Sequence, residues 1–557
     1  MEKGQIVTLT IEDMSAEGQG IGKLYETTRN ADAGRMDTSA DNSAQNTGNR
    51  GFAVFVKGAV VGDRVRAELT KVKKHYAFGR VLEVEALSPA RIEPFCPYQD
   101  TCGGCAYGTL NYDAQLALKE KQVRDKLIRM GGLTDPKMQP IMGMGNEPFR
   151  YRNKASMPVS TGGLVTQKGG IVQPVHEPRI GFYRAKTHEV VDCEDCWLQS
   201  EPAMAAAAAL RRFMEEDHIT SYDPRWDKGL MRHLIVRTAV GTGEVMVILV
   251  INGKAIPNAP KLVRMLDEAI AEIPVYEDGP LAGVAFNLES VVVNIHKSKT
   301  LEGQSLGEEC ITIAGKPTIT EEVGGLQFEI SPLSFYQVNR TQMMRLYDKA
   351  LEYASLKGDE TVLDLYCGVG TIGLFAAAEM NRRTAELNAA AASRGTAGSG
   401  QAAAVKLPGR VIGIESVKGA VLDANRNAVI NGIVNARYVC GKAEEELPKM
   451  LDPKSELKDE SLRVTHADVV ILDPPRAGCE QALLEAVVQA APDRIVYVSC
   501  DPATLARDIK WLGAHGYEFK EATPCDMFPW TGHVETVVLL SKGEVDSKKI
   551  RVEFSLE

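Results

Sequence analysis

The chain has 557 residues, with 64 Lys and Arg against 74 Asp and Glu, and a formal net charge of −10. This length predicts roughly three or four domains, and a hydrophobic content of 44% excludes a wholly disordered or fibrous protein. The apolar runs, such as residues 245–251, are far shorter than the roughly 20 residues of a membrane-spanning helix. Residues 1–10 lack the apolar core of a signal peptide. We therefore expect a soluble, cytoplasmic protein with no membrane partner.

Residues 1–85 contain short alternating segments separated by glycine turns, a pattern typical of a small β-barrel. Within them, residues 26–50 lack apolar periodicity and are expected to form a loop insertion. Residues 50–80 carry eight Lys or Arg and two acidic residues. Because local charge decides what a surface attracts, an acidic protein with such a stretch can still bind RNA phosphates.

Residues 86–335 are of mixed character, with a cysteine cluster and a predicted helix at 112–130. From residue 336 onward, apolar strand-like segments alternate with helical ones, and helices are expected at 416–431 and 479–491. This order predicts an α/β domain with a doubly wound parallel sheet.

Three segments do not fit this alternation. Residues 382–409 are rich in Ala, Gly and Ser, and residues 452–466 are charged, so both are expected to be surface insertions. Residues 546–557 are expected to form a tail after a C-terminal domain that ends at about residue 545.

The segment Gly368-Val-Gly370-Thr-Ile-Gly373 lies directly between a predicted strand and a predicted helix. Glycines at this place allow a tight turn and close approach of a ligand to the backbone. Taken alone, the pattern fits NAD, FAD or S-adenosylmethionine equally well.

The next two strands of this domain end in acidic residues. Glu415 can accept hydrogen bonds from ribose hydroxyls. Its separation from Gly373 exceeds the usual spacing of about 20 residues, and the predicted insertion accounts for the excess. Asp473, in Leu-Asp-Pro-Pro-Arg, is expected at the carboxyl edge of the sheet, where open α/β folds bind ligands; the alternative is a simple Asp-Pro turn.

Cys500 lies where a predicted strand meets a helix, followed by Asp501 and Pro502, which suit the cap and first turn of that helix. A cysteine beside a helix N-terminus is expected to favour the thiolate, the form in which it is nucleophilic. The alternative is a buried structural cysteine.

Near the end of the chain, Glu535 precedes an apolar strand. A desolvated carboxylate at the same pocket edge can take a proton. His533 is a second candidate for this role, and it is equally compatible with a structural histidine.

The eleven cysteines are unevenly distributed. Cys96, Cys102 and Cys105 lie within ten residues around Gly103-Gly104, and Cys193 and Cys196 follow later. Such a set can ligate an iron–sulfur cluster or zinc. Zinc would use Cys193 and Cys196 together with Cys102 and Cys105.

Several segments in this order resemble the RNA uracil-5-methyltransferases, and in particular the bacterial 23S rRNA enzymes that carry an iron–sulfur cluster. The segments are residues 335–339 (FYQVN), 364–373 (DLYCGVGTIG), 472–478 (LDPPRAG), 499–508 (SCDPATLARD) and 528–535 (FPWTGHVE). Residues 1–85 resemble the TRAM domain, an RNA-binding barrel of the OB type, and residues 86–335, with Arg150–Lys154 and Gly229–Arg237, resemble the family's central domain. The resemblance implies a Rossmann-like methyltransferase domain at 336–545.

The resemblance also implies roles for single residues. Cys500 matches the family's nucleophile and Glu535 its general base. Three of the four cluster cysteines match Cys96, Cys102 and Cys105, and Cys196 is favoured over Cys193 as the fourth because Gln199 follows it as in relatives. The residues that match contacts to S-adenosylmethionine are Gln337, Tyr366, Thr371, Glu415 and Asp473, with Thr371 standing where many relatives have Asn.

This family reading predicts a reaction in which the Cys500 thiolate adds to C6 of uracil, C5 takes the methyl group of S-adenosylmethionine, and Glu535 removes the C5 proton. The target base must leave its stack to reach these groups. A [4Fe-4S] cluster is expected to order the central domain and to help seat RNA rather than to transfer electrons. The enzyme is expected to act on 23S rRNA as a monomer.

Three alternatives remain from the sequence. A tRNA uracil-5-methyltransferase would share all the chemistry, since RNA choice depends on shape and loop contacts. A non-catalytic iron–sulfur factor that binds RNA during ribosome assembly would need the barrel and the cysteines, but not Cys500 paired with Glu535. An NAD-dependent oxidoreductase would use only the glycine turn.

Overall fold

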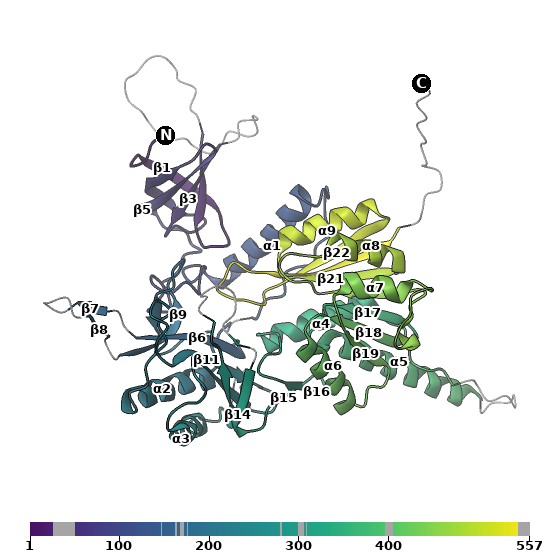
Figure 1. The fold of residues 1–557 in the computed structure, drawn as a ribbon. Helices are drawn as coiled ribbons and strands as arrows, with labels where there is room; N and C mark the ends of the chain where they lie inside the picture. The colour runs from purple at the N-terminus through teal and green to yellow at the C-terminus, as the bar shows by residue number, and fades with distance from the viewer. Residues whose placement is uncertain are drawn as a thin grey trace, which may run out of the picture. The chain divides into compact units, whose positions relative to one another are not determined.

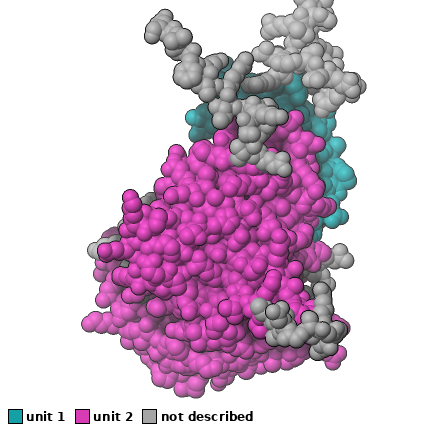
Figure 2. Space-filling model, turned by 90° about the vertical axis from the view of Figure 1, so that its right-hand side faces the viewer, with its two compact units in different colours: residues 1–121, 184–187, 528–533 teal, residues 122–183, 188–527, 534–557 magenta. Residues whose placement is uncertain are grey.

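The computed structural model describes residues 1–25, 51–145, 148–161, 164–166, 172–174, 177–278, 281–298, 306–307, 309–395 and 405–543. The loop insertion predicted at 26–50 and the tail predicted at 546–557 lie outside these residues. The chain divides into two compact units (Figure 2), one of residues 1–121, 184–187 and 528–533 and one of residues 122–183, 188–527 and 534–557. Among the described helices, none is long and apolar enough to cross a membrane.

In the first unit, five strands close into a barrel in the order β1-β2-β3-β5-β4 (Figure 1), which confirms the predicted N-terminal barrel. Small and branched apolar side chains, among them Ile11, Val54 and Val65, fill its interior. The strands are β1 (Ile6–Met14), β2 (Gly20–Leu24), β3 (Phe52–Lys57), β4 (Arg64–Val72) and β5 (Tyr76–Ala86). Helix α1 (Tyr112–Arg129) follows, close to the predicted range.

The middle of the chain forms a seven-stranded sheet in the order β10-β9-β6-β11-β12-β13-β14. Helices α2 (Glu201–Glu216) and α3 (Ala259–Ala271) pack on one face of it, against side chains such as Val159, Ile180 and Leu234. The strands of this sheet are β6 (Lys154–Thr161), β9 (Pro178–Tyr183), β10 (Val190–Asp192), β11 (Met231–Thr238), β12 (Glu244–Ile251), β13 (Asn287–Ile295) and β14 (Glu309–Gly315). Two short hairpins pair β7 (Leu164–Thr166) with β8 (Val172–Pro174) and β15 (Ile319–Val323) with β16 (Leu326–Ile330).

The C-terminal sheet has the order β19-β18-β17-β20-β21-β23-β22 (Figure 1). Its first five strands are parallel, as the sequence predicts, whereas β23 runs antiparallel to both of its neighbours, which the sequence pattern does not reveal. The strands are β17 (Thr361–Leu365), β18 (Arg410–Glu415), β19 (Ala436–Cys440), β20 (Val469–Leu472), β21 (Arg494–Ser499), β22 (Tyr517–Cys525) and β23 (Glu535–Lys542).

Helices contact this sheet from both faces, so the doubly wound arrangement is confirmed. Side chains that alternate along the strands, such as Leu363 and Leu365, share a core with α1 and the helices α7, α8 and α9, while α4, α5 and α6 contact the strands of the sheet separately from this core. The helices are α4 (Arg340–Ala354), α5 (Thr371–Gly395), α6 (Lys418–Ile430), α7 (Ala443–Leu451), α8 (Gln481–Ala490) and α9 (Pro502–Ala514), with a short 3₁₀ helix at Glu460–Leu462.

The first half of the predicted insertion at 382–409 is helical, because α5 continues to Gly395. Alanine has the highest helix propensity of all residues, and the run Ala389–Ala392 therefore extends the helix that starts at the glycine turn. Residues 396–404 lie outside the described part of the chain.

Candidate active site

The glycine turn joins β17 to α5 in a conformation that most side chains disfavour. Tyr366, Gly368 and Gly370 have φ angles of 64°, 55° and 79°. A Cβ atom at Gly370 would lie 2.7 Å from the ring of Tyr438, and one at Gly373 would lie 2.6 Å from Asp364 Oδ2. Gly370 therefore meets two constraints, a left-handed backbone and close packing.

Glu415, the last residue of β18, lies beside the glycine turn. Its carboxylate accepts hydrogen bonds from the backbone N–H of Gly368, at 3.2 Å, and of Val417, at 2.8 Å. The end of β18 is thereby tied to the glycine turn, and the predicted contact of Glu415 with ribose hydroxyls stays a prediction.

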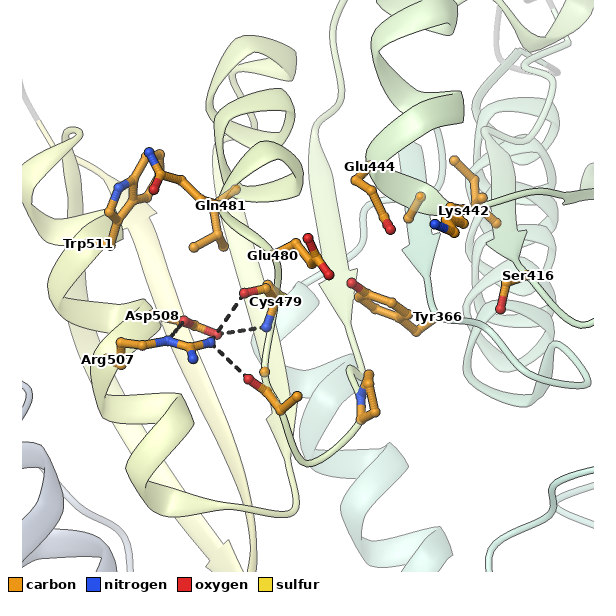
Figure 3. A pocket seen from close by; sticks show the side chains of 16 residues that line it. Tyr366, Ser416, Lys442, Glu444, Cys479, Glu480, Gln481, Arg507, Asp508 and Trp511 are labelled. Atoms are coloured by element: carbon orange, nitrogen blue, oxygen red, sulfur yellow. Dashed lines mark hydrogen bonds and ion pairs between the residues drawn. The ribbon is translucent and has the colours of Figure 1, made fainter. Parts of the chain in front are cut away.

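A cavity of about 640 Å³ lies beside the turn. Figure 3 shows Tyr366 in the middle of its lining, with Ser416 and Lys442 on one side and Glu480 on the other. Across the cavity, Asp508 accepts a hydrogen bond from the backbone N–H of Cys479 at 2.9 Å. The cavity is thus formed by loops that follow β17, β18, β19 and β20, at the carboxyl edge where open α/β sheets bind ligands.

Cys500 and Glu535 come from neighbouring strands at this same edge. Cys500 directly follows β21, and Glu535 begins β23, which pairs with β21 so that Ser499 lies opposite Thr536. Glu535 lies close enough to Cys500 to raise the pKa of its thiol, and Asp473, which follows β20, raises the pKa values of both groups. The structure therefore brings together three of the predicted site residues.

The acidic groups of this edge hold their protons unusually strongly. Burial, reinforced by Asp473, raises the pKa of Glu535 to about 8. Burial alone raises the pKa of Asp473 to about 7, and burial with Asp473 nearby raises that of Asp364 to about 7. Carboxyl groups with such pKa values can both take and release protons near neutral pH.

Cys500 does not show the predicted preference for the thiolate. Burial, together with Glu535 and Asp473, raises the pKa of its thiol to about 12. Asp501 does cap α9, accepting hydrogen bonds from Ala503 and Thr504 at 2.8 and 3.0 Å. The expectation of a thiolate was wrong because desolvation and two acidic neighbours outweigh the helix terminus.

Two residues that the sequence analysis does not single out belong to this group. Arg476 lowers the pKa values of both Cys500 and Glu535, and its place in Asp-Pro-Pro-Arg, three residues after Asp473, was a visible signal. Tyr347 is buried on α4, and its hydroxyl lies 3.1 Å from the hydroxyl of Thr371. No motif marks Tyr347, since it is one aromatic residue on an amphipathic helix.

Gln337 is buried in the segment before α4, where its backbone carbonyl accepts a hydrogen bond from the Asn153 side chain at 2.9 Å. Within the described residues, no recorded hydrogen bond joins the Gln337 side chain to the acidic group. Asn339 caps α4 and donates to the carbonyl of Met527 at 3.1 Å. His533, the alternative base, belongs to the other compact unit.

The cysteines of the predicted cluster fall in both units: Cys96, Cys102 and Cys105 in the first, and Cys193 and Cys196 in the second. The neighbouring Cys193 thiol, with backbone N–H groups and Arg150, lowers the pKa of Cys196 to about 6. The Cys193 thiol itself donates to the backbone carbonyl of Asp195 at 3.2 Å, and the surroundings favour the thiolate at Cys196.

Among the residues that the structure describes, one group of three possible metal ligands has its donor atoms close together: His466, Asp468 and Asp493. It contains no cysteine, and two of its members are exposed. The sequence analysis did not single out these residues.

Two family models match the chain. Residues 1–82 match the TRAM domain, and residues 396–543 match the tRNA (uracil-5-)-methyltransferase model. An uncharacterized RNA methyltransferase of Halalkalibacterium halodurans is 36% identical over 97% of this chain and 98% of its own length. One of Caldanaerobacter subterraneus is 38% identical over 97% of this chain and 98% of its own length.

A solved structure shows the same likeness. The Pyrococcus abyssi tRNA (uracil-54, C5)-methyltransferase in complex with S-adenosyl-L-homocysteine matches with a TM-score of 0.62 and 25% identity, over 96% of this chain and 99% of that one. Relatives above 30% identity match along nearly their whole length, and the two domain models occur in the order that the sequence analysis expects. The chain therefore belongs to the RNA uracil-5-methyltransferase family.

Proposed function

We propose that this enzyme methylates C5 of a uridine in 23S rRNA, with S-adenosylmethionine as the methyl donor. The observation that carries the proposal is the placement of Cys500 and Glu535 on neighbouring strands at one sheet edge, beside the glycine turn. A thiol and a base on the same pocket are what the addition and later removal of a nucleophile at C6 require. Neither an oxidoreductase nor a non-catalytic RNA-binding factor has a use for this pair.

The residues of the edge fit the proposed donor. Gly368 and Gly370 belong to the turn, Glu415 at the end of β18 accepts a hydrogen bond from it, and the cavity lined by Tyr366 and Ser416 would take the adenosyl group. When bound, S-adenosylmethionine supplies an electrophilic methyl group on a sulfonium cation. Asp473 and Glu415 make this edge acidic, which favours a cationic ligand. Gln337 and Thr371 remain proposed contacts on the strength of the family resemblance.

The thiol of Cys500 releases its proton to solvent, and the thiolate adds to C6 of the flipped uracil, which makes C5 electron-rich. C5 takes the methyl group as its bond to the donor sulfur breaks and S-adenosylhomocysteine leaves. The Glu535 carboxylate then removes the proton from C5, and the S–C6 bond breaks so that the ring double bond forms again and the thiolate is restored. The raised pKa of Glu535 makes it a stronger base than an ordinary carboxylate. The Arg476 cation favours the anionic forms of both groups.

Cys96, Cys102, Cys105 and Cys196 are proposed to hold a [4Fe-4S] cluster. Thiolates are the ligands that such clusters prefer, and Cys196 is the cysteine of its pair whose thiolate the surroundings stabilise. The cluster would help to order the central part of the chain.

The choice of 23S rRNA rests on the resemblance to the cluster-bearing rRNA enzymes, whereas the matched solved structure is a tRNA enzyme. Mapping of 5-methyluridine in total RNA from cells with and without the gene decides between them. We expect a 23S rRNA position to lose its methyl group. Loss confined to tRNA would establish the tRNA alternative, and no loss in either RNA would contradict the methylation proposal.

The covalent step predicts opposite behaviour of two variants. With RNA and methyl donor, Glu535→Gln should accumulate a protein–RNA adduct, because the C5 proton cannot be removed, whereas Cys500→Ala should form neither adduct nor product. Denaturing gels and mass spectrometry of the linked nucleotide measure this. Cys310→Ala, which changes a cysteine on β14 of the central sheet, is the control and should turn over normally. Rapid, clean turnover of Glu535→Gln would assign the proton to another base.

Arg476 should set the pH at which the enzyme becomes active. Cys500 and Glu535 both act in their deprotonated forms, so kcat/KM should rise with pH. Arg476→Ala raises the pKa of both groups and should move this rise to higher pH by roughly 1 unit, the scale on which a nearby charge shifts a pKa. Arg476→Lys keeps the positive charge and should restore most of the profile. A profile that Arg476→Ala leaves in place would remove Arg476 from this role.

The two central cysteines should differ in their effect on iron. Cys196→Ala should lose a large share of the iron and sulfide of anaerobically purified protein, because it removes a ligand, while Cys193→Ala should retain them, because it removes only a hydrogen-bond donor. Iron and sulfide analysis with visible absorption measures the difference. Equal loss in both variants would contradict the assignment, and zinc in place of iron would overturn the cluster.

A further inference from the structure

A second cavity, of about 570 Å³, lies on the central sheet. Its size falls within the range of about 300 to 1,000 Å³ that is typical of small-ligand pockets. Its wall comes from three adjacent strands, β6, β9 and β11, and from the loops that contain residues 188–190 and 221–225. The proposed methyl transfer uses none of these residues.

The cavity occupies the face of the sheet that α2 and α3 leave uncovered. Val159, Ile180 and Leu234 point toward these helices. Because side chains alternate along a strand, the neighbouring Arg179 and His233 point to the opposite face. The register places Ser160 opposite Arg179 and Pro158 opposite His233, so that these side chains share one surface.

This surface carries a cation without a counterion. The backbone of Arg179 is paired in the sheet, whereas its guanidinium, which lines the cavity, makes no hydrogen bond or ion pair with another described residue. Asp223, an acidic residue of the wall, is engaged by Arg225 at 2.6 Å. The second acid, Glu189, is exposed, and the lining contains three arginines against these two acids. The uncompensated charge of the interior is therefore positive, and it favours an anionic group such as a phosphate.

Flat aromatic groups lie beside this charge. The guanidinium of Arg232 stacks over the ring of Tyr222 at 4.1 Å from the ring centroid, and its Nη1 donates to the carbonyl of His296 at 2.9 Å. Tyr183 is 37% exposed at the mouth, with its ring centroid 5.6 Å from that of His188. Exposed rings next to guanidinium groups are the surfaces on which unstacked nucleobases pack.

His233 adds a polar group that has no partner. Its Nδ1 atom is buried and unbonded, whereas buried polar atoms are nearly always hydrogen-bonded. Burial, with Arg232 and His296 nearby, lowers the pKa of the imidazole to about 4, so the ring is neutral. Because Nδ1 is shielded from solvent, only the other ring nitrogen of the neutral imidazole, Nε2, is left to face the edge of a base in the cavity.

We propose that this cavity binds one unstacked nucleotide of the RNA substrate, with its base against Tyr183 and its phosphate on Arg179. The base edge meets His233 within the cavity. The site is separate from the pocket of Cys500 and anchors a nucleotide other than the one that is methylated. This inference rests on the proposed function, because it takes the ligand to be part of the RNA that the enzyme modifies.

The test compares Arg179→Ala and Tyr183→Ala with Arg212→Ala in the full-length protein, using steady-state methylation of an unmodified RNA transcript. Arg212 lies on α2, which packs on the other face of the sheet, and is 59% exposed. Each cavity variant should raise KM for RNA roughly tenfold, at the lower end of what stacking of one base contributes, and should leave kcat unchanged. Arg212→Ala should leave both constants unchanged. An unchanged KM in the cavity variants, or a loss confined to kcat, would overturn the proposal.

A second measurement identifies the ligand directly. RNA containing 4-thiouridine should crosslink to the peptide that contains Tyr183, and the crosslink should fall in Arg179→Ala. Crosslinks that avoid this peptide would contradict the assignment. Saturable binding of uridine or adenosine monophosphate, without any change in RNA affinity in the variants, would show a site for free nucleotides and would overturn the RNA assignment.

The two proposals fail in different ways. If wild-type protein methylates no RNA but still binds the transcript, and the cavity variants weaken that binding, the methylation proposal fails and the nucleotide site stands. If methylation is intact and the variants match the wild type, the nucleotide site fails alone.

Discussion

The site depends on desolvation. Two carboxyl groups and one thiol are withdrawn from water at the carboxyl edge of the C-terminal sheet. Cys500, Glu535 and Asp473 each hold their protons more strongly than they would in water, mainly because burial disfavours their charged forms. Such a group is stable in its protonated state. A positive charge placed beside it favours the deprotonated form, which is the nucleophile or the base. Arg476 supplies part of that charge permanently. A cationic methyl donor is therefore matched to this edge, because a nearby positive charge favours the deprotonated forms in which Cys500 and Glu535 are proposed to react.

The fold creates this edge by ending several strands at one level. The glycine turn follows β17, and Glu415 ends β18. Asp473 follows β20 and Cys500 follows β21, all at the carboxyl ends of parallel strands. The antiparallel strand β23 begins at this edge, and its first residue is Glu535. Tyr438, on strand β19, stabilises the turn, since its hydroxyl donates to the carbonyl of Gly370 at 3.1 Å. Close packing against this ring explains why the turn needs glycine as much as its backbone angles do.

The sequence predicts the parts of the site that depend on chain order, and misses those that depend on tertiary surroundings. The strand-to-helix positions of Gly368, Asp473 and Cys500 follow from local pattern, and the structure brings Cys500, Glu535 and Asp473 to one edge. The protonation state of Cys500 was predicted wrongly because its acidic neighbours come from strands that are remote in sequence. Tyr347 was missed because no motif marks a single aromatic residue on an amphipathic helix. Ala-rich residues 382–395 were read as an insertion, although their helix propensity continues α5.

An acidic chain with an acidic pocket must still bind a polyanion, and the central sheet shows how the two demands are separated. On strands β6 and β11, Lys154 and Arg237 are neighbours in the register. Burial, with Arg237 and Arg152 nearby, lowers the pKa of Lys154 to about 8, mainly because burial disfavours the charged amine. Arg237 is itself buried and donates to the backbone carbonyl of Pro332 at 3.2 Å. The acidic groups and the buried cations thus lie in different parts of the chain, the first at the edge proposed to bind a cationic methyl donor and the second on the sheet proposed to bind RNA.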